Sequence, residues 1–138
     1  MKCAVTVDAS VFVNAFSSTE KGSDDSLAFL DKLRKSKTPL IQPTLFFPEV
    51  VAAIARKQDD TDVALQLAEE LKNFPSLTLI DLDESLADLA GEMAAKHRLR
   101  GCDAVYAAVA FRFGTQLVSL DKEQLERVGK ILSAKAPY

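Results

Sequence analysis

Four carboxylates stand where an apolar, β-rich run of residues gives way to a helical pattern. Asp8 and Asp121 each end such a run, and Glu49 and Asp103 each open an apolar helical segment. Two carboxylates about 5 Å apart would repel each other by on the order of 3 kcal/mol at an effective dielectric of 20. Oxygen ligands without His or Cys favour Mg²⁺ or Mn²⁺ over Zn²⁺. Such an ion activates water and offsets charge on a phosphodiester, so these residues suit metal-assisted phosphodiester hydrolysis.

Each of these acids, taken alone, also has a purely structural explanation. Asp8 and Asp103 could be N-caps, and Asp121 with Gln124 forms a capping box, a feature that contributes about 1 kcal/mol to a helix. Glu49 could simply complement the positive end of a helix dipole. The chemical interpretation therefore depends on whether the fold brings the four together.

Two serines and a basic run accompany the acids. Ser10 and Ser119 stand two positions from the first and the last acid, where their hydroxyls could orient a carboxylate or a metal-bound water. Turn formation explains the serines equally well. Lys96, Arg98 and Arg100 lead directly into the third acid and are candidates for binding the substrate backbone, while the alternative is a basic helix C-terminus that complements the dipole.

The elements that must position these residues are short strands alternating with longer helices. Apolar runs predict five strands at Cys3–Val7, Pro39–Gln42, Leu77–Leu82, Gln116–Leu120 and, more weakly, Lys130–Ser133. Amphipathic stripes predict covering helices across 27–33, 64–71 and 86–93. Leu45–Ala55 and Ala104–Phe113 are apolar almost all round, so we expect them to pack against the sheet or a partner chain.

This alternation indicates an α/β fold with a parallel sheet. In such a sheet, right-handed crossovers place the end of every strand and the start of every following helix at the same edge. The four acids should therefore share one edge, near the point where the strand order reverses. The length of 138 residues accommodates one domain, 1–138, and no second one.

Composition excludes or disfavours several classes of protein. The net charge of −3 disfavours a globally basic nucleic-acid footprint. No apolar run approaches the roughly 20 residues of a membrane span, and the start lacks a signal peptide, so we expect a soluble cytoplasmic protein with no membrane contact. Cys3 and Cys102 are expected as buried reduced thiols, and the single His97 argues against a histidine-rich metal site or a Ser-His-Asp triad.

Four motifs, in this order and at this length, resemble the PIN domain, most closely the VapC-type toxin ribonucleases of toxin-antitoxin pairs. The motifs are 7–11 (VDASV), 48–51 (PEVV), 102–110 (CDAVYAAVA) and 119–121 (SLD), and the resemblance spans essentially the whole chain. It implies a three-layer α/β/α fold with a five-stranded parallel sheet of order 3-2-1-4-5.

The resemblance also implies activity and partners. Asp8, Glu49, Asp103 and Asp121 correspond to the acidic quartet that holds Mg²⁺ or Mn²⁺ in such proteins, with Asp8 and Asp103 as direct ligands and Glu49 as a ligand or a base acting through water. The fourth acid is the most variable position of the quartet. The implied reaction is endoribonucleolytic hydrolysis of RNA, and the implied partners are a cognate antitoxin and a second copy of the chain in a homodimer.

Other interpretations remain open. A PIN nuclease could process RNA outside a toxin-antitoxin pair, or a PIN-like fold could bind without cleaving. A receiver-like signalling module also has an acidic Mg²⁺ pocket, but Asp8 lacks the paired acid expected at the first strand. A haloacid-dehalogenase-like phosphatase would require an acid where Ser10 stands.

Overall fold

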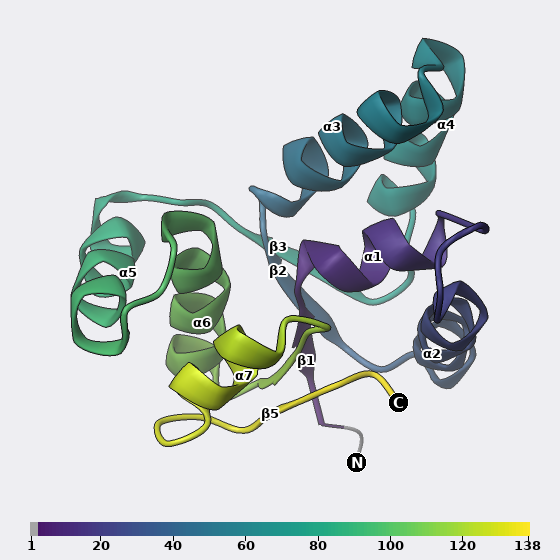
Figure 1. Ribbon diagram of the computed structural model, residues 1–138. Coiled ribbons are helices and arrows are strands. Elements are labelled where there is room, and N and C mark those ends of the chain that lie inside the picture. The colour runs from purple at the N-terminus through teal and green to yellow at the C-terminus, as the bar shows by residue number, and fades with distance from the viewer. Residues whose placement is uncertain (1–2) are drawn as a thin grey trace.

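A five-stranded parallel sheet forms the centre of the computed structural model, which describes residues 3–138 (Figure 1). The strands are β1 (Val5–Val7), β2 (Leu40–Pro43), β3 (Leu77–Ile80), β4 (Gln116–Val118) and β5 (Ala134–Lys135). Their order is β3-β2-β1-β4-β5, and every pair is parallel. The predicted α/β class and strand order are both confirmed.

Helices cover both faces of this sheet. They are α1 (Ala9–Ala15), α2 (Ser23–Ser36), α3 (Phe46–Gln58), α4 (Thr61–Lys72), α5 (Glu84–His97), α6 (Gly101–Phe113) and α7 (Lys122–Val128). In Figure 1, α5, α6 and α7 lie on one side and α1 and α2 on the other, while α3 and α4 project from the carboxyl edge of the sheet. The result is the three-layer arrangement expected from the sequence.

The core is densest where α6 lies between the sheet and α5. Residues 104–110 of this helix are all buried, because α6 contacts β1, β2 and β4 on one side and α5 on the other. Each fully buried Val or Leu in such a core contributes roughly 1.5–3 kcal/mol. The expected packing of Ala104–Phe113 against the sheet is thus observed. The other apolar segment differs, because α3 buries only one face, formed by Phe46, Val50 and Ile54.

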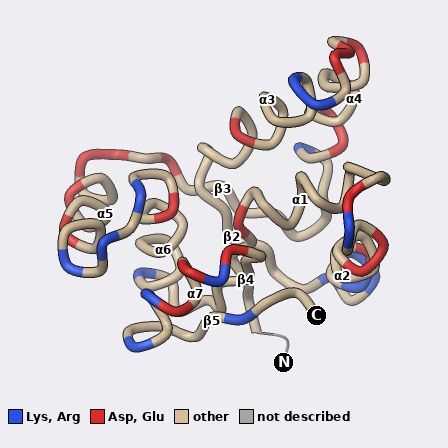
Figure 2. The backbone as a smooth tube through the Cα atoms, in the orientation of Figure 1, with Lys and Arg blue, Asp and Glu red and all other residues tan. Residues whose placement is uncertain are grey.

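Aspartate side chains are the N-caps of several helices. Asp60 accepts a hydrogen bond from the backbone N–H of Val63 at 3.1 Å, and Asp83 accepts one from that of Leu86 at 2.8 Å. These bonds satisfy backbone donors that a helix cannot pair internally. Basic residues gather at the opposite ends, as Figure 2 shows for α2 and α5. The basic groups near residues 34 and 56 are therefore ordinary helix C-termini.

The predicted fifth strand is wrong in position. Residues 130–133 form a turn in which the N–H groups of Ile131 and Leu132 both donate to the carbonyl of Val128. Pairing with β4 starts only after this turn, where the N–H of Leu117 donates to the carbonyl of Ser133 at 2.8 Å. The apolar pair at 131 and 132 is half-buried against the core instead of lying in the strand.

The prediction of buried thiols is also wrong. Cys3 and Cys102 are both free and both exposed. Cys3 precedes the first strand, before the covering layers begin, and Cys102 lies in the first turn of α6 at the open edge of the sheet. None of the helices among residues 3–138 is long and apolar enough to cross a membrane.

Candidate active site

The topology brings the four predicted acids to one edge of the sheet. β1 lies between β2 and β4, so the carboxyl ends of these three parallel strands are adjacent. Asp8 follows β1 and Asp121 follows β4, while Glu49 and Asp103 lie in the first turns of α3 and α6. In Figure 2, acidic and basic segments meet where α1, α6 and α7 begin. Four residues that are far apart in sequence thus share one small region.

Asp8 is the most buried of the four, with 7% of its surface exposed. It caps α1, and its Oδ2 accepts a hydrogen bond from the N–H of Ser10 at 3.1 Å. Burial is the main reason that the pKa of Asp8 is raised, and the negative charges of Asp103 and Asp121 raise it further, although the bonds from Ser10 oppose the shift. The fold therefore holds this carboxylate in a place where the ionised form is less stable than it would be in water.

A buried glutamine, Gln42, binds the end of β1, the strand that precedes Asp8. The Nε2 of Gln42 donates to the carbonyl of Val7 at 2.7 Å, and its Oε1 accepts from the N–H of Val7 at 2.6 Å. This side chain takes over the pairing of β1 with β2 at the point where the backbone ladder has ended. The sequence analysis missed Gln42. The available signal was a polar residue within a buried strand, which requires an internal partner.

The two predicted serines join the ends of β1 and β4. The Oγ of Ser119 accepts from the N–H of Asp121 at 3.0 Å and donates to the Oε1 of Gln124 at 2.7 Å. It lies 3.4 Å from the Oδ2 of Asp8, a longer contact that competes for the same single hydroxyl proton. The Oγ of Ser10 accepts from the N–H of the residue after Ser119 at 3.2 Å. Both serines thus lie against the buried carboxylate and hold the loops around it.

Glu49 points a carboxylate oxygen into the protein without a partner. Its Oε1 is buried and makes no hydrogen bond with any of residues 3–138, and the same holds for the hydroxyl of Tyr106. Burial is the main cause that raises the pKa of Glu49, and the charges of Asp8 and Asp103 add to it, while the nearby Tyr106 hydroxyl acts in the opposite direction without reaching hydrogen-bonding geometry. Burial raises the pKa of Tyr106 far above its usual range, so this residue is a neutral phenol.

Tyr106 was not among the predicted site residues, although a signal existed. It lies three positions after Asp103 in α6, and residues three apart share one face of a helix. The same face therefore presents an acid at the surface and a phenol beneath it.

Arg100 lies directly between two of the acids. Its Nε donates to the Oδ2 of Asp103 at 3.0 Å, and its Nη2 donates to the Oδ2 of Asp121 at 2.9 Å. Arg100 is also the N-cap residue of α6, so Asp103 belongs to the first turn and does not cap the helix. A cleft of about 340 Å³ adjoins this pair of ion pairs, and its lining includes Arg98 and Arg127.

Further basic side chains continue from this cleft over the end of α5 and over α7. Lys96 forms an ion pair with Glu92, and the guanidinium of Arg98 donates to a carbonyl of its own helix. A second hollow contains Lys96, Arg98, Arg127 and Lys130, interspersed with acidic residues of α7. Arg127 and Lys130 were missed because they stand in a different part of the sequence from the predicted basic run.

Comparison with known proteins decides the family. Residues 5–131 match the family model described as PIN domain. The chain belongs to the PIN domain family. This PIN domain is 36% identical over 115 residues to Ribonuclease VapC45 and to Ribonuclease VapC49, both of Mycobacterium tuberculosis, and the match covers 80% of this chain and 76% of each relative. The family resemblance carried by the four sequence motifs is confirmed.

Solved structures have the same PIN fold. DNA-bound VapBC from Salmonella typhimurium superimposes with a TM-score of 0.73 at 12% identity over 99% of both chains. Mycobacterium tuberculosis VapC20, described as a Sarcin-Ricin loop cleaving toxin, gives a TM-score of 0.72 at 16% identity over 88% of this chain and 93% of that one. At these identities the likeness concerns the fold. The family match favours a PIN domain over the receiver-like and dehalogenase-like interpretations.

The donor set of this PIN domain fits a hard cation, although no cage is formed in advance. Among residues 3–138, no group of three or more His, Cys, Asp or Glu side chains is already arranged around a metal position. Mg²⁺ commonly takes only one or two protein carboxylates and keeps several waters. The unpaired Oε1 of Glu49 and the buried carboxylate of Asp8 are the kind of oxygen donors that such an ion would satisfy.

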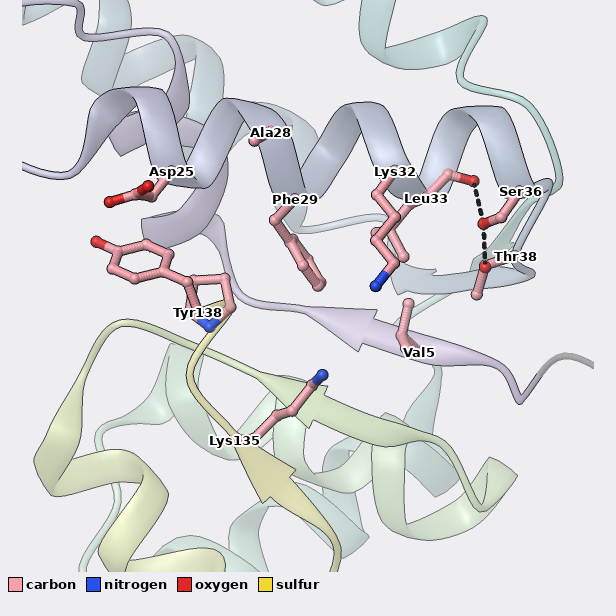
Figure 3. Close-up of a pocket in the computed structure, with 11 residues that line it drawn as sticks. Val5, Asp25, Ala28, Phe29, Lys32, Leu33, Ser36, Thr38, Lys135 and Tyr138 are labelled. Carbon is pink, nitrogen blue, oxygen red and sulfur yellow. Dashed lines mark hydrogen bonds between the residues drawn. The ribbon is translucent and has the colours of Figure 1, made fainter.

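The PIN domain has another hollow on the face of the sheet that α2 covers (Figure 3). It measures about 360 Å³ and lies between α2 and the C-terminal residues. Figure 3 shows Phe29 and the amino groups of Lys32 and Lys135 pointing into it, and the Lys135 Nζ lies 5.9 Å from the centre of the Phe29 ring. None of the four acids contributes to this hollow, so it is separate from the candidate active site.

Proposed function

We propose that this PIN domain is an endoribonuclease that hydrolyses RNA phosphodiester bonds with the help of Mg²⁺ or Mn²⁺. The observation that carries the proposal is the meeting of Asp8, Glu49, Asp103 and Asp121 at the carboxyl edge of the sheet, with the first two held in unfavourable buried positions. Acids in such positions are typical of functional sites. The relatives named as ribonucleases support RNA as the substrate.

Each acid has a distinct role in this proposal. Asp8 and Asp103 are the residues that would hold the cation, and Asp121 completes the group at its outer side. When bound, a divalent ion would lower the pKa of a coordinated water and offset negative charge on the phosphodiester. Glu49, with one unpaired carboxylate oxygen, either joins these ligands or accepts the proton of the attacking water. Ser10 and Ser119 keep the Asp8 carboxylate in place.

Binding of the RNA backbone falls to the basic residues beside the acids. Lys96, Arg98 and Arg100 stand where α5 ends and α6 begins, next to Asp103. Guanidinium groups form paired hydrogen bonds with phosphates, and ammonium groups act as point charges. Because the whole chain carries a net charge of −3, this local basic surface would provide the affinity for RNA.

We place this ribonuclease in a toxin-antitoxin pair of the VapBC type, as a cytoplasmic homodimer silenced by a cognate antitoxin. Several proteins with the same fold are described as toxin-antitoxin complexes, which supports the pairing. Copurification with the product of the adjacent reading frame tests the pairing.

The test of catalysis compares Asp8→Asn and Asp103→Asn with the unmodified protein on defined RNAs, with Mn²⁺ and with EDTA. We expect each substitution to reduce the cleavage rate at least about 100-fold, since loss of a directly acting group typically costs this much. The control is Asp88→Asn, which changes the same charge at an exposed position of α5. Cleavage that survives EDTA or both substitutions would refute the metal-dependent mechanism.

A PIN-like domain that binds RNA without cleaving it is the second candidate. The ion pairs of Arg100 with Asp103 and Asp121 favour it, since one guanidinium already occupies both of these acids. This candidate predicts equal RNA affinity for the unmodified protein and Asp8→Asn, and no cleavage by either. A PIN nuclease outside a toxin-antitoxin pair would instead cleave RNA without any copurifying antitoxin.

A further inference from the structure

Arg100 is the basic side chain that forms ion pairs with two of the four clustered acids in this structure. Its guanidinium bridges Asp103 and Asp121 through two charge-assisted hydrogen bonds of 3.0 and 2.9 Å. Among residues 3–138, no other Lys, Arg or His forms an ion pair with either acid, and none forms one with Asp8 or Glu49. One arginine therefore occupies the outer side of a site whose inner acids are left without a cation.

The side chain that makes this bridge can leave it without disturbing the core. Arg100 is 77% exposed, whereas Asp103 and Asp121 are only 14% and 28% exposed. Its backbone is fixed as the N-cap of α6, and the carbonyl of Arg100 accepts the N–H of Ala104 at 2.9 Å. The guanidinium can therefore swing on a fixed backbone while the two carboxylates stay in place.

The space into which it would move is a cleft that already exists beside the two ion pairs. The adjoining cleft of about 340 Å³ is lined by Arg98 and Arg127 as well as by Arg100 itself, and by the acidic Asp103, Asp121 and Glu123. A guanidinium released from the acids would stay within this cleft, next to the surface assigned above to the RNA backbone. The same side chain could thus serve the acids in one state and a phosphate in the other.

We propose that Arg100 is a displaceable counter-ion that competes with the divalent cation for Asp103 and Asp121, and that cation binding releases its guanidinium towards the substrate phosphate. This inference rests on the proposed function, because it requires the acids to take up a divalent ion. Coupling of this kind is reciprocal, so RNA that holds the released guanidinium also strengthens cation binding.

The test measures Mn²⁺ affinity directly, by electron paramagnetic resonance of free Mn²⁺ in titrations without RNA. Arg100→Gln removes the competing charge and should bind Mn²⁺ roughly three- to tenfold more tightly, the range expected when one or two exposed ion pairs no longer have to be broken. Arg98→Gln is the matched control, since it removes the same charge from a neighbouring position that contacts neither acid. Its Mn²⁺ affinity should change less than twofold.

Thermal unfolding gives a second, independent readout. In EDTA, Arg100→Gln should unfold at a lower temperature than the unmodified protein, because Asp103 and Asp121 lose their counter-ion. Saturating Mn²⁺ should remove this difference. Arg100→Lys retains the charge but cannot donate to both acids in the same forked geometry, so its Mn²⁺ affinity should lie between those of the unmodified protein and Arg100→Gln.

The outcomes separate failure of this inference from failure of the proposed function. Mn²⁺ binding by the unmodified protein, with equal or weaker binding by Arg100→Gln, would overturn the competition and leave the metal site intact. Tighter binding by both Arg100→Gln and Arg98→Gln to the same extent would also overturn it. The effect would then come from the lower positive charge of the whole protein and not from the contacts of Arg100 with the acids. No Mn²⁺ binding by any of the variants would overturn both the competition and the metal-dependent function.

Discussion

The Asp8 carboxylate is buried without a basic side chain beside it. No Lys or Arg of residues 3–138 forms an ion pair with it, and the charges of Asp103 and Asp121 add to the raised pKa of Asp8. Its hydrogen bonds from Ser10 compensate for burial only in part, because its pKa is still raised. A residue in this position destabilises the fold unless a cation joins it, which is the pattern expected of a site selected for binding.

This position makes the stability of the metal-free protein depend on pH. The native pKa values of Asp8 and Glu49 lie above the ordinary values of 3.8 and 4.5, so the native state holds more protons than the unfolded state. The free energy of unfolding should therefore fall as the pH rises from about these ordinary values through the native ones.

Asp8→Asn tests this dependence. In EDTA at pH 7, the variant should unfold about 4 °C above the unmodified protein, a shift that corresponds to about 1 kcal/mol in a domain of this size. At pH 4 the difference should shrink, because the raised pKa of Asp8 leaves a larger share of its carboxyl protonated there than at pH 7. Calorimetry at the two pH values measures both effects. An equal or lower unfolding temperature for Asp8→Asn at pH 7 would contradict the claim that the buried charge of Asp8 destabilises the metal-free protein.

At the scale of the elements, the end of β1 depends on one side chain from β2. Gln42 pairs with both backbone groups of Val7, one residue before Asp8. Gln42→Leu keeps the volume but leaves two buried backbone groups unpaired, at a cost of about 2–4 kcal/mol. Chemical denaturation measures this loss.

The matched control for that change is Gln66→Leu, at an exposed position of α4, which should alter the free energy of unfolding by less than about 0.5 kcal/mol. If Gln42→Leu were as stable as the control, the side chain would not be what holds the end of β1.

Some elements could be predicted from sequence because their signals are local. Short apolar runs identify β1 to β4, and the strand order follows the family resemblance. The fifth strand was misplaced because the apolar pair Ile131 and Leu132 packs against the core from a turn. Hydrophobicity alone does not distinguish burial in a strand from burial in a turn.

The sequence was enough to predict which acids form the site, but not which side chains contact them. Asp8 and Asp121 stand at strand ends, so the parallel topology alone places them at one edge. The pairing of Arg100 with Asp103 and Asp121, and the unpaired Tyr106 beside Glu49, depend on side-chain positions set by tertiary packing. The exposure of both cysteines has the same origin, because it depends on which residues happen to lie outside the covering layers.

At the scale of the whole molecule, one edge of the sheet carries both the acids and a projecting pair of helices. The carboxyl edge carries the acids with the cleft of Arg98, Arg100 and Arg127 beside them, while α3 and α4 project from the same edge (Figure 1) and expose Val63 and Leu65. Because Glu49 lies in the first turn of α3, the projecting pair extends outward from the candidate active site.

The most direct measurement is a crystal structure of the protein soaked with Mn²⁺, read by the anomalous scattering of the metal. The account predicts one strong anomalous peak within coordination distance of both Asp8 and Asp103, at the carboxyl edge of the sheet, with the Arg100 guanidinium moved off the acids. Anomalous density only at other positions, or none at saturating Mn²⁺ with Arg100 still bridging Asp103 and Asp121, would contradict it.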